Sequence, residues 1–156
     1  MKKIIYGKPG YGKSYTYLKP LLETAANVVL ITPNGTNELK YMNISYDIFE
    51  SFSIGFGKII PGKHGIIIEP CYLLTLLRRI GLSDFSKDTN FTVIITNIGI
   101  FLSDTDIRAA INIINCWHSN VLLEYTGREE DCIKELDLNS SCWDDWTKIS
   151  VVNKLY

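Results

Sequence analysis

The chain has 156 residues, of which 46% are hydrophobic and 21% charged, and its formal net charge is −1. This length suits one domain with a buried core, and the balanced charge excludes the strongly basic surface of a dedicated nucleic-acid-binding domain. No apolar run reaches the roughly 18 residues of a membrane span, and the opening Met-Lys-Lys-Ile-Ile-Tyr reaches Gly7 too soon for a signal peptide. We therefore expect a cytoplasmic chain without a membrane segment.

The first predicted element is a short strand at residues 3–6, which runs into a glycine-rich turn and then a helix. Gly7, Gly12, Lys13 and Ser14 match G-x-x-x-x-G-K-[ST], the Walker A pattern of a P-loop. Glycines let the backbone curl so that successive N–H groups point at phosphate oxygens, and the helix N-terminus favours an anion. In such a loop Lys13 contacts the β- and γ-phosphates, and the Ser14 hydroxyl binds Mg²⁺.

The pattern therefore predicts ATP and Mg²⁺ as cofactors. The residues expected to hold the nucleotide are Gly7, Lys8, Pro9, Gly10, Tyr11, Gly12, Lys13, Ser14 and Tyr15.

Further along the chain, residues 15–26 predict a helix that Pro20 should kink or end early. Residues 28–32 (VVLIT) predict a buried strand before the turn Pro33-Asn34-Gly35, and residues 38–63 show no clear pattern. Residues 64–69 predict an apolar strand that ends in Glu69 and stops at Pro70. A helix should follow at residues 71–80, with Gly81 as its C-terminal stop.

The second half of the chain alternates strands and helices. Residues 82–90 predict a polar loop and residues 91–97 an apolar strand, and Ser103-Asp104-Thr105-Asp106 is a capping box that should start a helix at 104–116. Expected after it are a strand at 120–125, short helices at 129–136 and 142–146, and a last strand at 149–152. This alternation predicts an α/β fold with a mostly parallel sheet and helices on both faces.

Two polar residues end predicted strands at the edge where such sheets bind ligands. Glu69 is the candidate for holding Mg²⁺ or activating water, with Asp104 or Asp106 as a possible second acid, and simple solvation of a strand end is the alternative. Asn97 is the candidate for a hydrogen bond to the γ-phosphate or the attacking water, and an ordinary turn residue is its alternative.

The order of these parts resembles the HerA/FtsK superfamily. The segments are GKPGYGKS, NVVLITPNG, GIIIEP, FTVIITN and LSDTDIRAAINIINCWHSNVLLE, and they are most like viral genome-packaging ATPases and the filamentous-phage assembly ATPases of zonular occludens toxin type. Thr96-Asn97 stands where these families have Thr-Gln, Ile107-Arg108 matches a later Ile-Arg, and Glu69-Pro70 departs from the usual Asp-Glu. The resemblance covers residues 2–125.

The resemblance implies a P-loop NTPase fold of ASCE (RecA-like) type, in which the Asn97 strand lies between the P-loop strand and the Glu69 strand. It also implies a homo-oligomeric ring with DNA in a central pore, docked on a capsid or portal-type protein. Arg108, or Arg78 and Arg79, would then reach the ATP of a neighbouring subunit.

We accordingly expect residues 1–156 to form a single P-loop ATPase domain. Its catalytic residues would be Lys13, Glu69, Asn97 and Arg108, and its metal ligands Ser14 and Glu69. The expected function is an ATP-hydrolysing motor subunit that translocates DNA, as in viral genome packaging. The alternatives are a small phosphotransferase of nucleotide-kinase type and a degenerate ATP-binding switch that does not hydrolyse ATP.

Overall fold

The computed structural model describes residues 1–32, 47–50, 63–67 and 72–152. Within them one sheet has the strand order β3-β4-β2-β5-β6-β1-β7, and every pairing is parallel. The strands are β1 (Lys2–Gly7), β2 (Asn27–Thr32), β3 (Asp47–Glu50), β4 (Lys63–Ile67), β5 (Phe91–Ile95), β6 (Asn120–Thr126) and β7 (Thr147–Val151). The parallel α/β class predicted from the sequence is confirmed.

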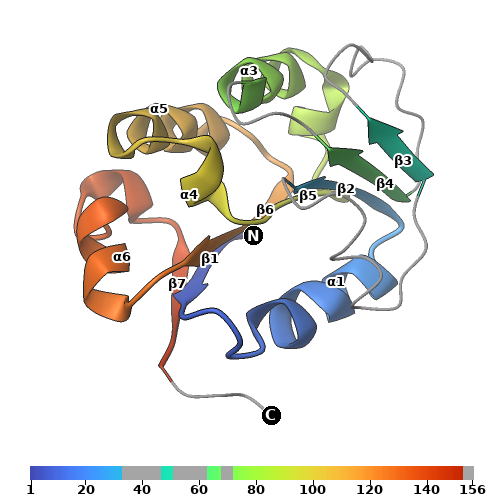
Figure 1. The fold of residues 1–156 in the computed structure, drawn as a ribbon. Helices are drawn as coiled ribbons and strands as arrows, with labels where there is room; N and C mark the ends of the chain where they lie inside the picture. The colour runs from blue at the N-terminus through green and yellow to red at the C-terminus, as the bar shows by residue number, and fades with distance from the viewer. Residues whose placement is uncertain (33–46, 51–62, 68–71, 153–156) are drawn as a thin grey trace.

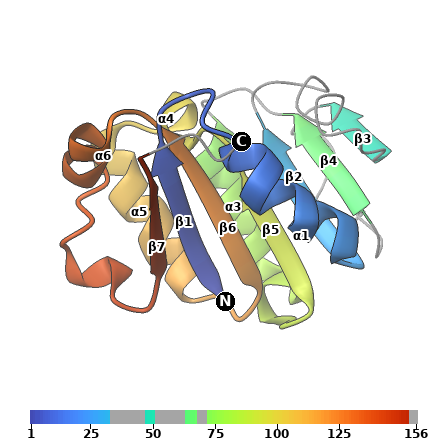
Figure 2. The same ribbon diagram turned by 90° about the horizontal axis from the view of Figure 1, so that it is seen from below.

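Helices cover both faces of the sheet, as expected (Figure 1; Figure 2). The α-helices are α1 (Lys19–Thr24), α3 (Leu73–Leu82), α4 (Ile98–Phe101), α5 (Asp104–Asn115) and α6 (Glu129–Glu135). Helix α1 packs on one face through Leu22, in a cluster with Leu30 and Leu122. Helices α3, α5 and α6 pack on the other face.

The central strands are buried because both of their faces are covered. All five residues of β5 are buried, as are Val121 to Tyr125 of β6. Such strands read as continuous apolar runs, which is why the sequence pattern located them well. Short strand β3 had no comparable signal and was not predicted.

The order of the strands refines one expectation. Strand β5, which leads to Asn97, does lie between β1 and β4, but it is hydrogen-bonded to neither of them. Its neighbours are β2 and β6, so β6 is the strand beside the P-loop strand β1. The polar residues of β6 therefore lie closer to the P-loop than the resemblance implied.

The P-loop runs into a widened helical turn. Residues Ser14–Leu18 form a π-helical turn, and α1 follows with Pro20 in its first turn. A proline ring within an α-helix clashes with the carbonyl four residues earlier, whereas the first turn tolerates it. Of the two predicted effects of Pro20, a kink or an early end, the structure shows a change from π to α winding just before Pro20, and the helix ends at Thr24, before the predicted end at residue 26.

The start of α5 and the end of α3 can be compared with the capping residues predicted from the sequence. The capping box is confirmed, because Ser103 accepts a hydrogen bond from the Asp106 N–H at the start of α5. The expected stop at Gly81 is wrong, because α3 continues to Leu82 and ends at the extended residue Ser83. Instead, the bare Cα of Gly81 makes room for Trp117, whose indole nitrogen would lie 3.2 Å from a Cβ there.

The sequence also missed α4, and the predicted polar loop at residues 82–90 contains the 3₁₀ turn Asp84–Lys87. The predicted helix at residues 142–146 is the shorter 3₁₀ turn Ser141–Trp143. None of the described helices combines the length and the apolar character needed to cross a membrane.

Candidate nucleotide-binding site

The candidate site lies where three strands end side by side. Gly7, the last residue of β1, is in register with Thr126 of β6 and with Val151 of β7. The strands approach so closely that a Cβ at Gly7 would lie 2.4 Å from the Val151 carbonyl oxygen. Glycine is therefore required here by the packing of β1 against β7, in addition to its place in the Walker A pattern.

The loop after Gly7 has the backbone expected of a phosphate-binding turn. Gly10 and Gly12 have φ angles of 77° and 85°, in the left-handed region that favours glycine. The loop closes onto the following helix, since the Thr16 N–H donates to the Gly12 carbonyl over 2.9 Å. The strand, loop and helix that the Walker A pattern requires are thus all present.

Lys13 is folded back into its own loop. Its side chain is only 5% exposed, and its Nζ donates to the Gly7 carbonyl over 2.8 Å and to the Lys8 carbonyl over 2.7 Å. Glu124 Oε1 lies 3.6 Å from the same nitrogen. Burial lowers the pKa of Lys13 because it disfavours the charged form, and the nearby Glu124 carboxylate offsets part of that effect.

Glu124 joins the P-loop to the end of β5. It is 4% exposed and lies on β6, opposite Ile5 of the P-loop strand. Its Oε1 also accepts from the Thr126 hydroxyl over 2.8 Å, and its Oε2 accepts from the Asn97 N–H over 2.7 Å. A buried carboxylate is stable only with such partners, and Glu124 has both an ammonium group and two hydrogen bonds.

Asn97 adopts a backbone conformation that few side chains tolerate. Its φ and ψ are 49° and 51°, in the left-handed region where asparagine is enriched. It turns the chain from β5 into α4, and its Oδ1 lies 2.8 Å from the Thr126 hydroxyl, whose single proton is shared between Asn97 Oδ1 and Glu124 Oε1. Asn97 is therefore fixed at the same strand edge as Lys13, through Glu124 and Thr126.

One further residue pair ties the neighbouring strands together at this edge. Thr96 is fully buried, and its hydroxyl donates to the Thr32 hydroxyl over 3.0 Å. The Thr96 N–H donates to the Ile31 carbonyl, which continues the pairing of β5 with β2. These contacts fix the end of β5 against β2, so Asn97 projects from a rigid base.

The buried thiol near the site is chemically inert. Burial raises the pKa of Cys132 to about 11, and the charge of Glu135 adds to that effect. A thiol with such a pKa stays protonated near neutral pH and is a poor nucleophile. The chemistry of the site therefore depends on the amine, carboxylate, amide and hydroxyl groups.

These groups fit a nucleotide phosphate chain. The Lys13 ammonium lies within the loop, and a phosphate would replace the carbonyl contacts of Nζ with charge-assisted hydrogen bonds. The left-handed glycines leave the loop free of side chains at two positions. Among the described residues there is no cluster of three or more potential metal ligands of the His, Cys, Asp or Glu type.

Several predicted residues lie elsewhere or outside the described residues. Glu69, and the side chains of Ser14 and Tyr15, are not among the residues that the structure describes. Arg108 lies on α5, largely exposed, and its guanidinium bonds Asp137 over 2.5 Å. The roles proposed for these residues therefore remain predictions.

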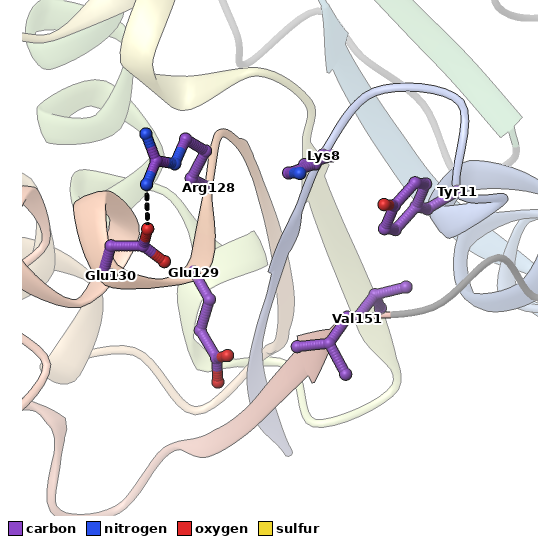
Figure 3. Close-up of a pocket in the computed structure, with 7 residues that line it drawn as sticks. Lys8, Tyr11, Arg128, Glu129, Glu130 and Val151 are labelled. Atoms are coloured by element: carbon purple, nitrogen blue, oxygen red, sulfur yellow. Dashed lines mark hydrogen bonds and ion pairs between the residues drawn. The ribbon is translucent and has the colours of Figure 1, made fainter.

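A pocket of about 300 Å³ lies beside the loop (Figure 3). Lys8 and Tyr11 of the loop form one side, and residues at the start of α6 and the end of β7 form the other. Arg128 stands at the start of α6 and pairs with Glu130, as the dashed line in Figure 3 marks. Arg128 is thus an arginine of this chain close to the P-loop in space, although it is far from it in sequence.

The sequence interpretation missed Glu124 and Thr126 as members of the site. A signal for Glu124 was present, because it is the one acid within the apolar strand NVLLEYT. A buried strand position in a parallel sheet holds a carboxylate only if a partner is brought to it. The identity of that partner, Lys13, follows only from the pairing of β6 with β1.

Several chains of solved structures match this one. One of them is the genome packaging NTPase B204 from Sulfolobus turreted icosahedral virus 2, in complex with ATP-gammaS; the identity is 14% and the TM-score 0.49. The match covers 80% of this chain and 64% of that one, so the chain spans less than two thirds of the length of this neighbour. No protein-family profile matches the chain, and no curated protein does.

Proposed function

We propose that this chain binds ATP at its P-loop and hydrolyses it to ADP and phosphate. The observation on which this rests is Lys13, whose buried ammonium lies in a glycine-rich loop between a parallel strand and a helix, beside the carboxylate of Glu124. An ammonium group in a loop of inward N–H groups binds phosphate. The buried acid Glu124 also accepts a hydrogen bond from the Asn97 N–H at the end of a neighbouring strand, and it thereby connects the phosphate site to Asn97.

The described residues have distinct roles in this proposal. Bound ATP with Mg²⁺ supplies the phosphoryl group that is transferred to water. Lys13 neutralises charge that develops on the phosphate oxygens, which is the main protein contribution in phosphoryl transfer. Asn97 presents an amide that hydrogen-bonds the phosphate or the attacking water, and Glu124 holds both Lys13 and Asn97 in position. Ser14 is proposed to hold the metal ion; Glu69, which follows β4 four strands away from β1 in the sheet, stays a metal ligand on the sequence argument alone.

We further propose that the chain acts as one domain in a homo-oligomeric ring that moves DNA, as in viral genome packaging. This part rests on the order of sequence segments that resembles packaging and phage-assembly ATPases. With a net charge of −1, a single copy offers no overall excess of basic residues for DNA, so contact with DNA would depend on local basic residues that a ring brings together. A capsid or portal-type protein would anchor such a ring.

The experiment that tests the function is ATP turnover by the purified chain, measured with and without duplex DNA. A motor should hydrolyse ATP and be stimulated by DNA. A nucleotide kinase would instead convert a nucleoside monophosphate to its diphosphate, and a switch module would bind ATP without turnover. Binding without turnover under both conditions contradicts an ATPase, and turnover unaffected by DNA contradicts the motor role.

Replacing Glu124 with glutamine should lower the turnover number by about 100-fold, the typical effect of displacing catalytic groups by 1 Å. Glutamine keeps the shape of the side chain but removes the charge that opposes Lys13 and fixes the Asn97 N–H. ATP binding should remain, because the phosphates themselves bind Lys13. A matched control is Glu23→Gln, at an exposed carboxylate on α1 whose ion-pair partner is Lys19.

The pH dependence distinguishes this positioning role from a general loss of stability. Glu124 raises the pKa of Lys13 against the effect of burial, so its removal lowers that pKa further. ATP binding needs the charged ammonium, and its loss at alkaline pH should therefore begin at lower pH in Glu124→Gln than in the wild type. An unchanged alkaline limb, or unchanged turnover, would remove Glu124 from the proposed site.

A further inference from the structure

The pocket beside the P-loop has the size and the walls of a small-molecule site. Its volume of about 300 Å³ is at the lower end of the range for such sites. We propose that this pocket binds the nucleoside half of ATP, with Tyr11 stacking on the base and Glu129 accepting hydrogen bonds from the ribose hydroxyls. The inference rests on the proposed ATP binding and adds the residues that recognise the nucleoside.

The position of the pocket follows from the phosphate site. Lys8 lines the pocket, and its carbonyl oxygen lies 2.7 Å from Lys13 Nζ. A phosphate chain bound at Lys13 therefore begins beside the wall of the pocket. Val151, on the opposite wall, is in register with Gly7 at the start of the loop. A nucleotide that leaves the loop on this side has its nucleoside in the pocket.

The apolar walls suit a flat heterocycle. Tyr11 is half-buried and packs at the edge of the apolar cluster that contains Val151. In Figure 3 the Tyr11 ring stands on the loop, with Val151 below it at the end of β7. An aromatic ring and an aliphatic surface offer stacking contacts to any base, and loss of one such ring costs about tenfold in affinity.

The polar wall suits the sugar. Glu129 Oε1 accepts from the Ser150 hydroxyl over 3.0 Å, which uses only one of the several hydrogen bonds that a carboxylate accepts. Glu130 is already paired with Arg128 and is therefore less available. Glu129 and Tyr11 come from the α6 start and the loop, and Figure 3 shows them on opposite sides of the pocket.

The charged residues of the pocket favour one direction of binding for the nucleotide. Lys8 is exposed at the loop, and within the described residues no ion pair involves it. Its ammonium attracts the Glu130 carboxylate and also faces the side from which the phosphates would enter, while the carboxylate of Glu129 repels phosphates and accepts hydrogen bonds from hydroxyl groups. The pocket is therefore matched to a nucleotide bound in one direction, with the phosphates at Lys13 and the sugar at Glu129.

The test compares three ligands by calorimetry: ATP, inorganic tripolyphosphate and 2′,3′-dideoxy-ATP. The variants are Tyr11→Leu, which keeps an apolar side chain but removes the ring, and Glu129→Gln. The control variants are Tyr72→Ala, at an exposed tyrosine before α3, and Glu23→Gln on α1. Tyr11→Leu should weaken ATP binding about tenfold and leave tripolyphosphate binding within twofold of the wild type.

Glu129 is tested by a cycle with the sugar hydroxyls. Dideoxy-ATP should bind the wild type several-fold more weakly than ATP does, and this difference should be smaller in Glu129→Gln, because the neutral amide oxygen accepts weaker hydrogen bonds than a carboxylate. The inference is overturned if wild-type protein binds ATP no better than tripolyphosphate, or if both variants bind ATP as the wild type does. Wild-type protein that binds neither ATP nor tripolyphosphate contradicts the proposed function itself, and the pocket assignment with it.

Discussion

Replacing Lys13 with methionine should abolish measurable ATP turnover and weaken ATP binding by about 100-fold, the effect of losing one or two charge-assisted hydrogen bonds. Methionine retains most of the apolar stem of lysine but not its charge, so it removes the phosphate contact with little change in packing. The measurements are ATP binding by calorimetry and phosphate release at saturating ATP. Turnover at the wild-type rate would show that Lys13 is not the phosphate-binding lysine.

Lys13→Met is expected to affect the stability of the fold as well as ATP binding. Lys13 is the ion-pair partner of Glu124, and the two side chains are 5% and 6% exposed. Removal of one member of a buried pair leaves the other charge uncompensated, at a cost of about 3–5 kcal/mol. Lys13→Met should therefore lower the melting temperature as well as ATP binding.

The double variant Lys13→Met/Glu124→Gln separates the two effects. Without either charge, the buried site has no unpaired ion, and the melting temperature should return toward that of the wild type. ATP binding should remain lost, because no ammonium is present in the loop. If the double variant regains ATP binding together with stability, the loss in the single variant came from unfolding and not from a missing phosphate contact.

The sequence predicted the elements of the fold better than their arrangement. Runs such as FTVII and NVVLIT predicted strands because buried parallel strands are apolar on both faces. The order of the strands depends on pairings between distant segments, which no local pattern specifies. That is why β6, the neighbour of β1, was not recognised as part of the site.

The candidate site shows the same limit at the level of single residues. Lys13 was found because the Walker A spacing is local, and Asn97 because it directly follows an apolar strand. The structure places Asn97 beside Lys13 through Glu124 and Thr126, contacts that join residues far apart in the chain. The turn at Asn97 requires a left-handed backbone conformation. Asparagine tolerates this conformation, but an asparagine in a sequence does not by itself predict it.

Loss of the arginine that assists ATP hydrolysis is the second change with a large expected effect on turnover. Loss of an arginine finger lowers turnover by about 10³ to 10⁵. Besides Arg78 and Arg79 on α3, two arginines are candidates for different reasons: Arg108 on the helix that the resemblance singles out, and Arg128 at the pocket assigned to the nucleoside, from which it would act on the ATP of a neighbouring subunit and not on its own. Both are exposed and paired with a carboxylate of their own chain, with Asp137 and Glu130 respectively.

Mixing experiments decide which of the two acts, and from which subunit. Each of Arg108→Ala and Arg128→Ala is mixed with Lys13→Met, and turnover of the mixture is compared with that of each variant alone. An arginine that acts on a neighbouring subunit allows some mixed interfaces to combine an intact Lys13 with an intact arginine, so activity partly returns. An arginine that acts within its own chain gives no recovery, because no single chain then holds both groups.

We expect Arg108→Ala to lose turnover and to recover on mixing, in keeping with a ring whose ATP sites lie between subunits. Lys134→Ala is the charge control, because Lys134 is an exposed cation in the last turn of α6. Its turnover should equal that of the wild type. Recovery requires subunits in contact, so wild-type turnover per chain should also fall on dilution as the ring dissociates. Full wild-type activity in a dilute monomer, or unchanged turnover in both arginine variants, would contradict the ring and leave a monomeric ATPase in its place.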